Sequence, residues 1–351
     1  MIIRTGLVGF GLGGRSFHAP FIAANQNYEL VSVVERKTSL SKAKYPRVKI
    51  ARSMEELLQD DSLDLIVITT PNETHFSFAK AALEAGRNVV LDKPMTVASD
   101  EAAQLIKFVK EKKKLLSVYQ SRRYASDALT IKALLERNVL GEIHEFEAQY
   151  NRYRPQLKNS WKETAVPGSG ILYDLGPHLI DQALDLFGFP KTITADIRKQ
   201  RPGTEADDYF DIRLDYGFNK VILKAGMLVR EQGPRYQIHG TKGSFIKYGD
   251  DPQDAALRAG ALPTDEGFGV EPEEHHGLLH TEIEGEIIIE KLVSEVGNFG
   301  LFYQNLYESI ANGKPLTERA EHGYNVVKMI ELAKDSNEQK RTIEVKGLLN
   351  S

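Results

Sequence analysis

The sequence predicts a two-part α/β protein, in which a doubly wound parallel sheet is followed by an α/β domain with a large open, mainly antiparallel sheet. Up to about residue 120, short apolar runs rich in β-branched residues alternate with helical stretches, as in βαβ units. After that point, alternating strands follow one another between turn residues, as in an antiparallel meander. The 351 residues are enough for two cores. We expect one domain over residues 1–120 and a second over 121–351.

The first element is an apolar strand that runs into a glycine-rich turn, Thr5 to Gly14. Gly9 permits the tight turn, Gly11 lets the backbone approach a pyrophosphate, and Gly14 lets the next helix pack against the strand. Such a turn alone is an ordinary loop about as often as a nucleotide site. Pro20 falls inside the expected helix and should kink it or delay its regular part.

The second half of a dinucleotide-binding fingerprint follows. The apolar strand Leu30 to Val34 ends at Glu35, at about the distance from Gly14 where a ribose-binding carboxylate belongs. The complete pattern favours a nucleotide site over a structural loop. Glu35 would accept hydrogen bonds from ribose hydroxyls, whereas Arg36 and Lys37 could bind a 2′-phosphate. The cofactor is therefore NAD or NADP, with a slight preference for NAD.

The remaining elements of the first domain continue the same alternation. Strands are expected at Asp64–Thr69, Asn88–Leu91 and Leu115–Tyr119. Ser53 with Glu56 forms a capping box that opens a short helix, and Ser99 can cap the helix through Ile106. A further helix through Ala79 to Glu84 should stop at Gly86.

In the second domain, residues 146–151 alternate between an apolar and a polar face. Further strands are expected at Thr192–Arg198, Tyr209–Tyr216, Lys220–Val229, Arg235–Gly240 and Gly243–Lys247. The stretch from Gly249 to His280 is acidic, rich in Gly and Pro and without periodicity, so we expect an insertion or long loop there. Helices near Leu301–Ala311 and Tyr324–Ala333 finish the chain.

Composition excludes several classes of function. The net charge of −4, with both signs interspersed, offers no basic tract for nucleic acid or a membrane surface. The chain has no cysteine, which excludes disulfides, thiolate catalysis and cysteine-ligated metals. The acidic pair and histidine pair at residues 273–276 match no zinc motif, so no metal is expected. Because the first strand begins almost at Met1, we expect no signal peptide and a cytoplasmic protein.

Two segments carry candidate chemistry. Asp92, Lys93 and Pro94 directly follow the strand at residues 88–91, at the edge where open α/β sheets bind ligands, so Lys93 should overlook the cofactor. In isolation, a solvated loop lysine is the more usual interpretation.

The second segment is Gly168 to Asp181, where a flexible turn leads into an apolar-faced helix. Asp174 and His178 are four residues apart. If one helix includes both, the carboxylate could orient the imidazole and steady its protonated form, as a general base requires. The alternative makes Asp174 a helix cap and His178 a half-buried histidine, which is the commoner outcome for an isolated D-x-x-x-H.

Taken together, these residues resemble the Gfo/Idh/MocA oxidoreductase family, whose pattern includes G-x-G-x-x-G, T-P-N-x-x-H, E-K-P and D-x-G-x-H. The matching segments here are Gly9–Gly14, Thr70–His75, Asp92–Pro94 and Asp174–His178, in order along nearly the whole chain. The sequence looks closest to the branch that contains NADP-dependent scyllo-inositol dehydrogenase. That likeness lies in Leu116–Tyr119, Tyr150–Pro155 and Arg235–Gly240.

The resemblance implies a Rossmann domain followed by an α/β domain whose open sheet commonly mediates dimerisation, so a homodimer or homotetramer is expected. Its members mostly interconvert a secondary alcohol and a ketone of a sugar or cyclitol, with a hydride moving to or from nicotinamide. Some relatives of this fold instead bind the dinucleotide as sensors without turnover. The presence of Lys93, Asp174 and His178 together argues against that alternative.

Roles for individual residues are carried over from the resemblance. His178 would accept the proton of the reacting hydroxyl, Asp174 would be its partner, and Lys93 would position and polarise that oxygen. Tyr153 and Arg154 are candidate substrate contacts, although an exposed strand end explains them equally well. The cofactor-binding residues would be Gly9, Phe10, Gly11, Leu12, Gly14, Glu35, Arg36, Thr70, Pro71, Asn72, His75, Asp92 and Lys93.

Two departures from the family pattern bear on these roles. Asp92 stands where the family usually has Glu, which shortens the side chain but keeps the carboxylate. Gln120 to Tyr124 stands where relatives often carry His-Asn-Arg-Arg-Trp, so substrate choice can differ.

Overall fold

The computed structural model describes residues 1–158 and 160–350. Within them the chain forms a six-stranded sheet in the order β3-β2-β1-β4-β5-β6 and a nine-stranded sheet in the order β14-β13-β12-β11-β7-β10-β9-β8-β15. The first sheet is parallel, and the second is antiparallel except where β7 pairs with β10. This confirms the fold class predicted from the sequence.

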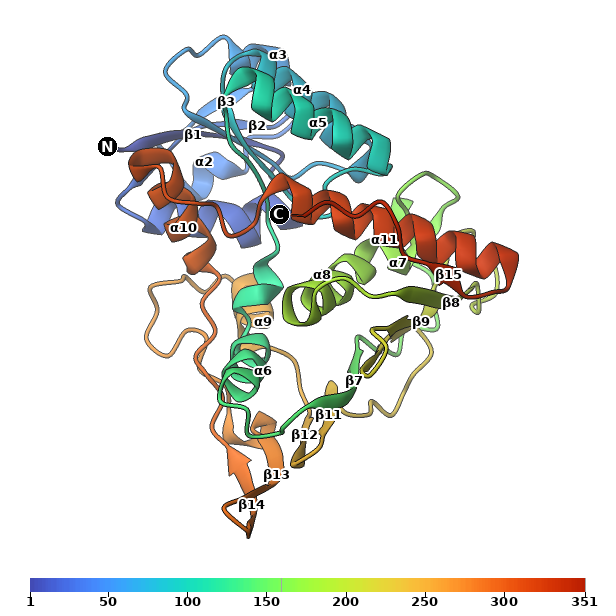
Figure 1. Cartoon of the computed structure of the whole chain (residues 1–351). Helices are drawn as coiled ribbons and strands as arrows, with labels where there is room; N and C mark the ends of the chain where they lie inside the picture. Colours follow the sequence, from blue (N-terminus) through green and yellow to red (C-terminus); the bar gives the residue numbers. More distant parts are fainter. Residues whose placement is uncertain (159, 351) are drawn as a thin grey trace.

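The first sheet lies between two helical layers. Its strands are β1 (Ile3–Val8), β2 (Tyr28–Val34), β3 (Lys49–Ala51), β4 (Leu65–Ile68), β5 (Asn88–Leu91) and β6 (Leu116–Val118). Its helices are α1 (Ala19–Ala24), α2 (Ser41–Lys44), α3 (Met54–Leu58), α4 (His75–Glu84) and α5 (Ser99–Lys112). Figure 1 shows α3, α4 and α5 on one face and α1 with a later helix, α10 (Gly300–Asn312), on the other. Covered on both faces, strands such as β4 consist entirely of buried residues.

The strand order places the ligand-binding edge. β1 pairs with β2 on one side and with β4 on the other, so the direction of winding reverses between β1 and β4. In open α/β sheets the ligand crevice lies beyond the carboxyl ends of the strands at such a reversal. The glycine turn follows β1, and Lys93 follows β5 on the same edge.

Of three predictions made from local sequence signals in this domain, the one at Pro20 is confirmed, the one at Ser53 is confirmed in part and the one at Ser99 is wrong. Residues Gly13–His18 form a π-helical turn (η1), and α1 begins only at Ala19 with Pro20 in its first turn, which confirms the predicted delay. Ser53 Oγ accepts from the Glu56 N–H at 3.2 Å, but the Glu56 carboxylate accepts from the Arg52 N–H at 2.6 Å, so only one half of the predicted capping box forms. Ser99 is not a cap. It lies inside α5, where its own N–H and hydroxyl donate to the Glu331 carboxylate at 2.7 and 2.6 Å, because a charged acceptor from another helix replaces the local one.

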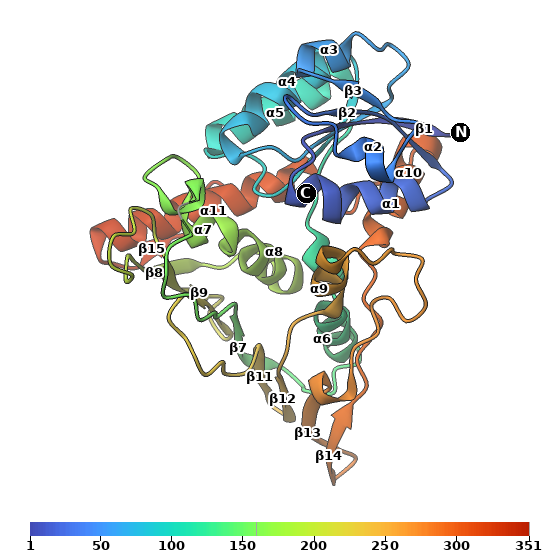
Figure 2. The same cartoon turned by 180° about the vertical axis from the view of Figure 1, so that it is seen from behind.

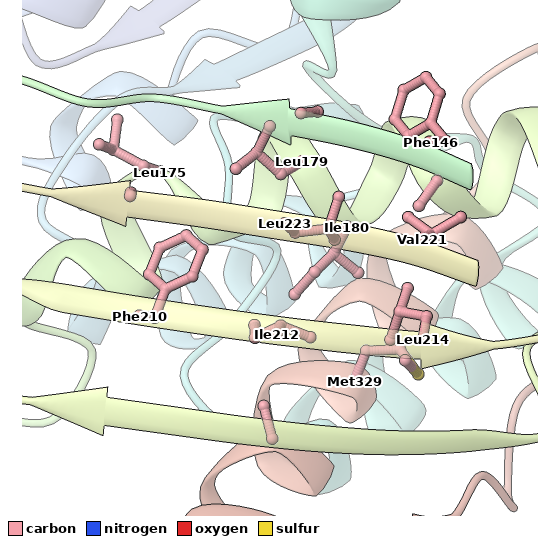
Figure 3. Close-up of a cluster of buried hydrophobic side chains, with 14 of the residues drawn as sticks. Phe146, Leu175, Leu179, Ile180, Phe210, Ile212, Leu214, Val221, Leu223 and Met329 are labelled. Atoms are coloured by element: carbon pink, nitrogen blue, oxygen red, sulfur yellow. The ribbon is translucent and has the colours of Figure 1, made fainter. Parts of the chain in front are cut away.

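The second sheet packs one face on helices. Its strands are β7 (Ile143–Gln149), β8 (Thr192–Arg198), β9 (Tyr209–Asp215), β10 (Lys220–Gly226), β11 (Tyr236–Gly240), β12 (Gly243–Lys247), β13 (Gly277–Ile283), β14 (Glu286–Leu292) and β15 (Ile343–Glu344). The helices of this part are α6 (Ser126–Glu136), α7 (Gly170–Asp174), α8 (Gly176–Phe187), α9 (Pro252–Ala259) and α11 (Ala320–Gln339). Figure 3 shows Leu179 and Ile180 of α8 and Met329 of α11 against Phe210 and Leu223 of the sheet. All five side chains are fully buried.

The segment expected to be an insertion or long loop is structured. Asp251 caps α9 by accepting from the Gln253 N–H at 2.8 Å, and the segment ends inside β13. A buried ion pair between Lys247 and Glu271, at 2.7 Å, fixes its middle. Its ion pair and tertiary contacts have no periodic signature, which is why the pattern of residues alone did not reveal this order.

The end of the chain returns to the first sheet. Phe299, Phe302 and Tyr303 of the α10 region share a core cluster with Leu7 and Phe21. Helix α11 lies between the two sheets in both views (Figures 1 and 2) and contacts both α5 and β8. The division at residue 120 therefore stays a prediction, to which the structure adds a C-terminal contribution to the first core. Among the described residues, no helix combines the length and hydropathy needed to span a bilayer.

Candidate active site

The glycine turn has the geometry that a dinucleotide requires. Gly9 has φ of +97°, which favours glycine. A Cβ on Gly14 would lie 2.2 Å from the carbonyl oxygen of Gly9, so the helix can approach the strand only without a side chain. A Cβ on Gly11 would meet nothing within 4 Å and would enter the open space where a pyrophosphate would lie. Phe10 is buried against Tyr45, whereas Leu12 is exposed beside this space. These residues fit a dinucleotide diphosphate.

Glu35 is arranged differently from the expected ribose ligand. Its side chain is buried, and each carboxylate oxygen accepts two hydrogen bonds from the loop that follows. One oxygen accepts from the Thr38 hydroxyl at 2.6 Å and the Leu40 N–H at 2.8 Å. The other accepts from the N–H and hydroxyl of Ser41 at 2.9 and 2.6 Å. A carboxylate has about four lone-pair sites, so none is left for a ribose hydroxyl. Burial tends to raise the pKa of Glu35, but these hydrogen bonds lower it overall.

Arg36 and Lys37 are exposed on the loop that Glu35 holds. Arg52 stabilises the same loop. Its guanidinium donates to the main-chain oxygen of Glu35 at 2.8 Å and to Ser39 Oγ at 3.2 Å. In the loop after β2, the side chains of Arg36 and Lys37 are therefore exposed, whereas the carboxylate of Glu35 is buried.

The segment after β4 ties parts of the site together. Thr70 and Thr74 share a hydrogen bond at 2.6 Å, and Pro71 between them is exposed. Asn72 Nδ2 donates to the main-chain oxygen of Gly168 at 2.8 Å, which links the first domain to the turn before α7. His75 is fully buried, with its ring nitrogens 3.0 Å from the Thr70 oxygen and 2.8 Å from the Pro94 oxygen. It holds two loops in place and faces away from open space, and burial lowers its pKa.

Lys93 reaches from the first domain to the second. Its Nζ contacts both the main-chain oxygen and Oδ1 of Asp174, the latter at 3.4 Å. Asp92 stabilises the turn from which it extends, because Asp92 Oδ1 accepts from the Lys93 N–H at 2.8 Å. Burial lowers the pKa of Lys93, and the Asp174 carboxylate partly restores it. An ammonium ion has three donors, so one remains for a ligand.

Asp174 and His178 do not share a single helix, contrary to the condition set above. Helix α7 ends at Asp174 and α8 begins at Gly176, with Leu175 between them. Pro177 explains the break, since it has no N–H to bond the oxygen of Tyr173 and its ring would clash there. Among the described residues, no hydrogen bond joins Asp174 to His178. Oδ1 of Asp174 instead pairs with Lys162 Nζ at 2.6 Å. Despite burial, Lys93 and Lys162 hold the pKa of Asp174 far below its usual range.

His178 is half-buried at the start of α8, and its Nδ1 has no hydrogen-bond partner in the described part of the chain. Burial lowers its pKa well below 6.5, and the charges of Lys93 and Arg122 lower it further. The imidazole is therefore neutral near pH 7 and able to accept a proton. The Tyr150 ring packs edge-on against it at 6.1 Å between centroids.

Both parts of the chain match known protein families in sequence. A sequence model described as an oxidoreductase family, NAD-binding Rossmann fold, matches residues 3–120. Its companion, described as an oxidoreductase family, C-terminal alpha/beta domain, matches residues 132–345. The chain belongs to the Gfo/Idh/MocA oxidoreductase family. It is an oxidoreductase whose first domain binds NAD or NADP.

Several relatives of this oxidoreductase match over nearly their full length. It is 41% identical to scyllo-inositol 2-dehydrogenase (NADP(+)) IolW of Bacillus subtilis (strain 168), over 97% of this chain and 95% of that protein. It is also 41% identical to the uncharacterized oxidoreductase YdgJ of Escherichia coli (strain K12), over 97% and 98%. Among solved structures, the oxidoreductase yvaA from Bacillus subtilis is similar at a TM-score of 0.95, with 40% identity over 98% of each chain.

Some residues around the site of this oxidoreductase were missed by sequence reasoning. Lys162 lies in the short η4 turn (Trp161–Glu163), which has no motif that would single it out. Arg122 is an ion-pair partner of Asp254 on α9, and its charge reaches His178. Arg152 also acts on the pKa of His178. Arg152 lies inside the Tyr150–Pro155 motif. The motif could therefore have pointed to Arg152, but only Tyr153 and Arg154 were predicted from it.

The two candidate substrate residues, Tyr153 and Arg154, lie at a strand end. The Tyr153 ring is 41% exposed and is covered by the Arg230 guanidinium at 3.9 Å. Arg154 is exposed, and it is close enough for the charge of Asp174 to act on its pKa, which burial and Arg152 lower overall. Within the described residues, neither side chain contacts Lys93 or His178, so their role stays a prediction. In the same residues, no group of three or more His, Asp or Glu side chains is arranged to hold a metal.

Proposed function

We propose that this oxidoreductase interconverts a secondary alcohol and a ketone of a cyclitol or sugar, with NADP as the preferred cofactor. The observation that carries the proposal is the contact of Lys93, after β5, with Asp174 of α7, close enough to His178 for both charges to act on its pKa. The scyllo-inositol dehydrogenase among the relatives supports a cyclitol as the substrate.

The preference for NADP rests on the loop after β2. Glu35 has its acceptor sites occupied, so it neither attracts ribose hydroxyls nor presents a free carboxylate to a 2′-phosphate. Arg36 and Lys37 are the exposed charges there, and charge-assisted hydrogen bonds to phosphate are among the stronger ones. The expected preference for NAD has no support in this geometry or in the NADP-dependent relative.

The side chains divide the chemistry among them. NADP, when bound, exchanges the hydride at its nicotinamide ring. The remaining donor of Lys93 binds the reacting oxygen and stabilises negative charge on it. His178 takes the hydroxyl proton during oxidation and returns it during reduction. Asp174, paired with both Lys93 and Lys162, keeps the Lys93 ammonium in position. Positioned proton transfer of this kind contributes about a hundredfold or more to the rate.

The test is turnover followed at the nicotinamide absorbance, with scyllo-inositol and a panel of cyclitols and sugars. We expect activity with at least one polyol and a higher kcat/KM with NADP than with NAD. His178→Ala should reduce kcat about a hundredfold or more and leave the Kd for NADPH nearly unchanged. His239→Ala is the matched control, because His239 hydrogen-bonds Ser244 within the second sheet. NADPH binding without turnover of any polyol would favour a sensor.

We further propose a homodimer or homotetramer built on the second sheet. Along β9, buried residues alternate with half-buried and exposed ones, so the second face of this strand is accessible. On β14 at the edge of the sheet, Ile287 and Ile289 are 70% and 61% exposed. Size-exclusion chromatography with light scattering tests this arrangement, and a monomer would contradict it.

A further inference from the structure

The structure contains a buried side-chain amide without a hydrogen-bond partner in the described part of the chain. Gln120 follows β6, and only 1% of its surface is exposed. Over residues 1–158 and 160–350, neither its Oε1 nor its Nε2 has a hydrogen-bond partner. Leaving a buried donor or acceptor without a hydrogen-bond partner is unfavourable, because the group has lost its hydrogen bonds to water. An amide that is unpaired at both ends is available to a group that both donates and accepts a hydrogen bond.

The strand register places Gln120 beside Lys93. In the parallel pair of β5 and β6, Leu91 is opposite Val118, and the Tyr119 N–H donates to the Leu91 oxygen at 2.8 Å. Both chains then leave the sheet at the same edge, Lys93 two residues after Leu91 and Gln120 two residues after Val118. Because β6 lies beyond β5 at the edge of the sheet, Gln120 is farther than Lys93 from the glycine turn after β1.

The segment that follows Gln120 is tied to the helix that carries His178. Arg123, three residues after Gln120, forms a double ion pair with Asp181, at 2.7 and 2.8 Å. Asp181 is three residues after His178 on α8 and so lies on the same side of that helix. The segment that carries Gln120 is thus tied to the helix that carries His178 and leaves the sheet at the same edge as Lys93.

We propose that the Gln120 amide binds a hydroxyl on the carbon next to the reacting carbon, so that the substrate class is a vicinal diol and its α-hydroxyketone. This inference rests on the proposed function. A hydroxyl can donate to Oε1 and accept from Nε2 at once, whereas a carboxylate, phosphate or ether oxygen can only accept and would leave Oε1 unpaired. We assign this hydroxyl to the carbon next to the reacting carbon because Gln120 and Lys93 leave adjacent strands at the same edge of the sheet.

The experiment compares wild type with Gln120→Met, which keeps the shape without hydrogen bonds, and Gln120→His, whose ring retains a donor and an acceptor. We expect Gln120→Met to lower kcat/KM for scyllo-inositol about ten- to a hundredfold, with an unchanged Kd for NADPH. Gln120→His should recover most of the loss. Trans-1,2-cyclohexanediol should inhibit wild type better than cyclohexanol, and Gln120→Met should abolish the difference.

Several outcomes would overturn the inference. They are equal kcat/KM in wild type and Gln120→Met, a parallel loss of NADPH affinity, or a preference for the diol that persists without the amide. If wild type bound scyllo-inositol without turning it over, the proposed function would fail, and weaker binding of scyllo-inositol to Gln120→Met, measured by calorimetry with NADPH present, would still support the role of Gln120. No binding of scyllo-inositol to wild type would contradict both.

Discussion

Replacing Glu35 separates a structural carboxylate from a ribose ligand. In Glu35→Gln, one carboxylate oxygen becomes an amide nitrogen that cannot accept from Leu40 or Ser41, whichever it faces. The hydroxyl of Thr38 or Ser41 can rotate and accept a hydrogen bond from the new amide nitrogen. The backbone N–H of Leu40 or Ser41 can only donate, so it loses its partner. Loss of one bond to a charged group, about 1.5–3 kcal/mol, with one buried N–H left unpaired, about 1–3 kcal/mol, predicts a loss of about 3 kcal/mol in the free energy of unfolding.

Urea unfolding of the protein without cofactor, at pH 7, measures this loss directly. NAD and NADP affinities of the same variant should change little by comparison. Arg36→Ala is the matched control next to it, because its side chain is exposed. It should weaken NADP binding about tenfold and leave the free energy of unfolding unchanged. Unchanged stability in Glu35→Gln, together with a large loss of NAD affinity, would refute the reasoning and restore Glu35 as a ribose ligand.

Three other outcomes follow from the geometry. Gly11→Ala should weaken NADPH binding about tenfold or more and leave the free energy of unfolding unchanged. Gly14→Ala should also destabilise the fold by about 1–3 kcal/mol, because its Cβ would collide with the Gly9 oxygen. Equal free energies of unfolding for the two variants in urea would contradict this. Because the pKa of His178 lies well below 6.5, the acid limb of kcat/KM for oxidation should fall below pH 6.5, and a limb near pH 7.5 would argue against His178 as the base. Burial raises the pKa of Glu318 from 4.5 to about 7, so the folded state binds this proton more tightly and stability falls as pH rises from 4.5 to 7. Glu318→Gln should be more stable than wild type by about 3 kcal/mol at pH 8 and similar to it at pH 4, and equal stability at pH 8 would be the contrary result.

The parts of the fold predicted from the sequence are those with local, periodic causes. The strand into the Gly9 turn, the delay of α1 at Pro20 and the alternating strands of the second sheet depend on neighbouring residues, so their pattern is visible in the chain. The cap at Ser99 failed because the acceptor comes from Glu331, which is remote in sequence. The same limit applies to α9, whose position depends on long-range burial.

At the site, motifs located the residues but not their partners. Lys93 follows β5, and His178 lies in the first turn of α8. The pairing of Asp174 with Lys93 and Lys162, in place of His178, follows from the helix break at Pro177 and from a lysine in an unpatterned turn. Neither can be read from a spacing of four residues. Unpaired polar atoms, such as those of Gln120, likewise appear only once burial is known.

The most direct measurement is a crystal structure of the protein with NADP and scyllo-inositol bound. The account predicts that Lys93 Nζ and a ring nitrogen of His178 both lie within about 3.2 Å of one substrate oxygen, on the carbon that faces the nicotinamide ring. A complex in which the two groups contact different parts of the ligand, or in which the polyol binds away from both, would contradict it.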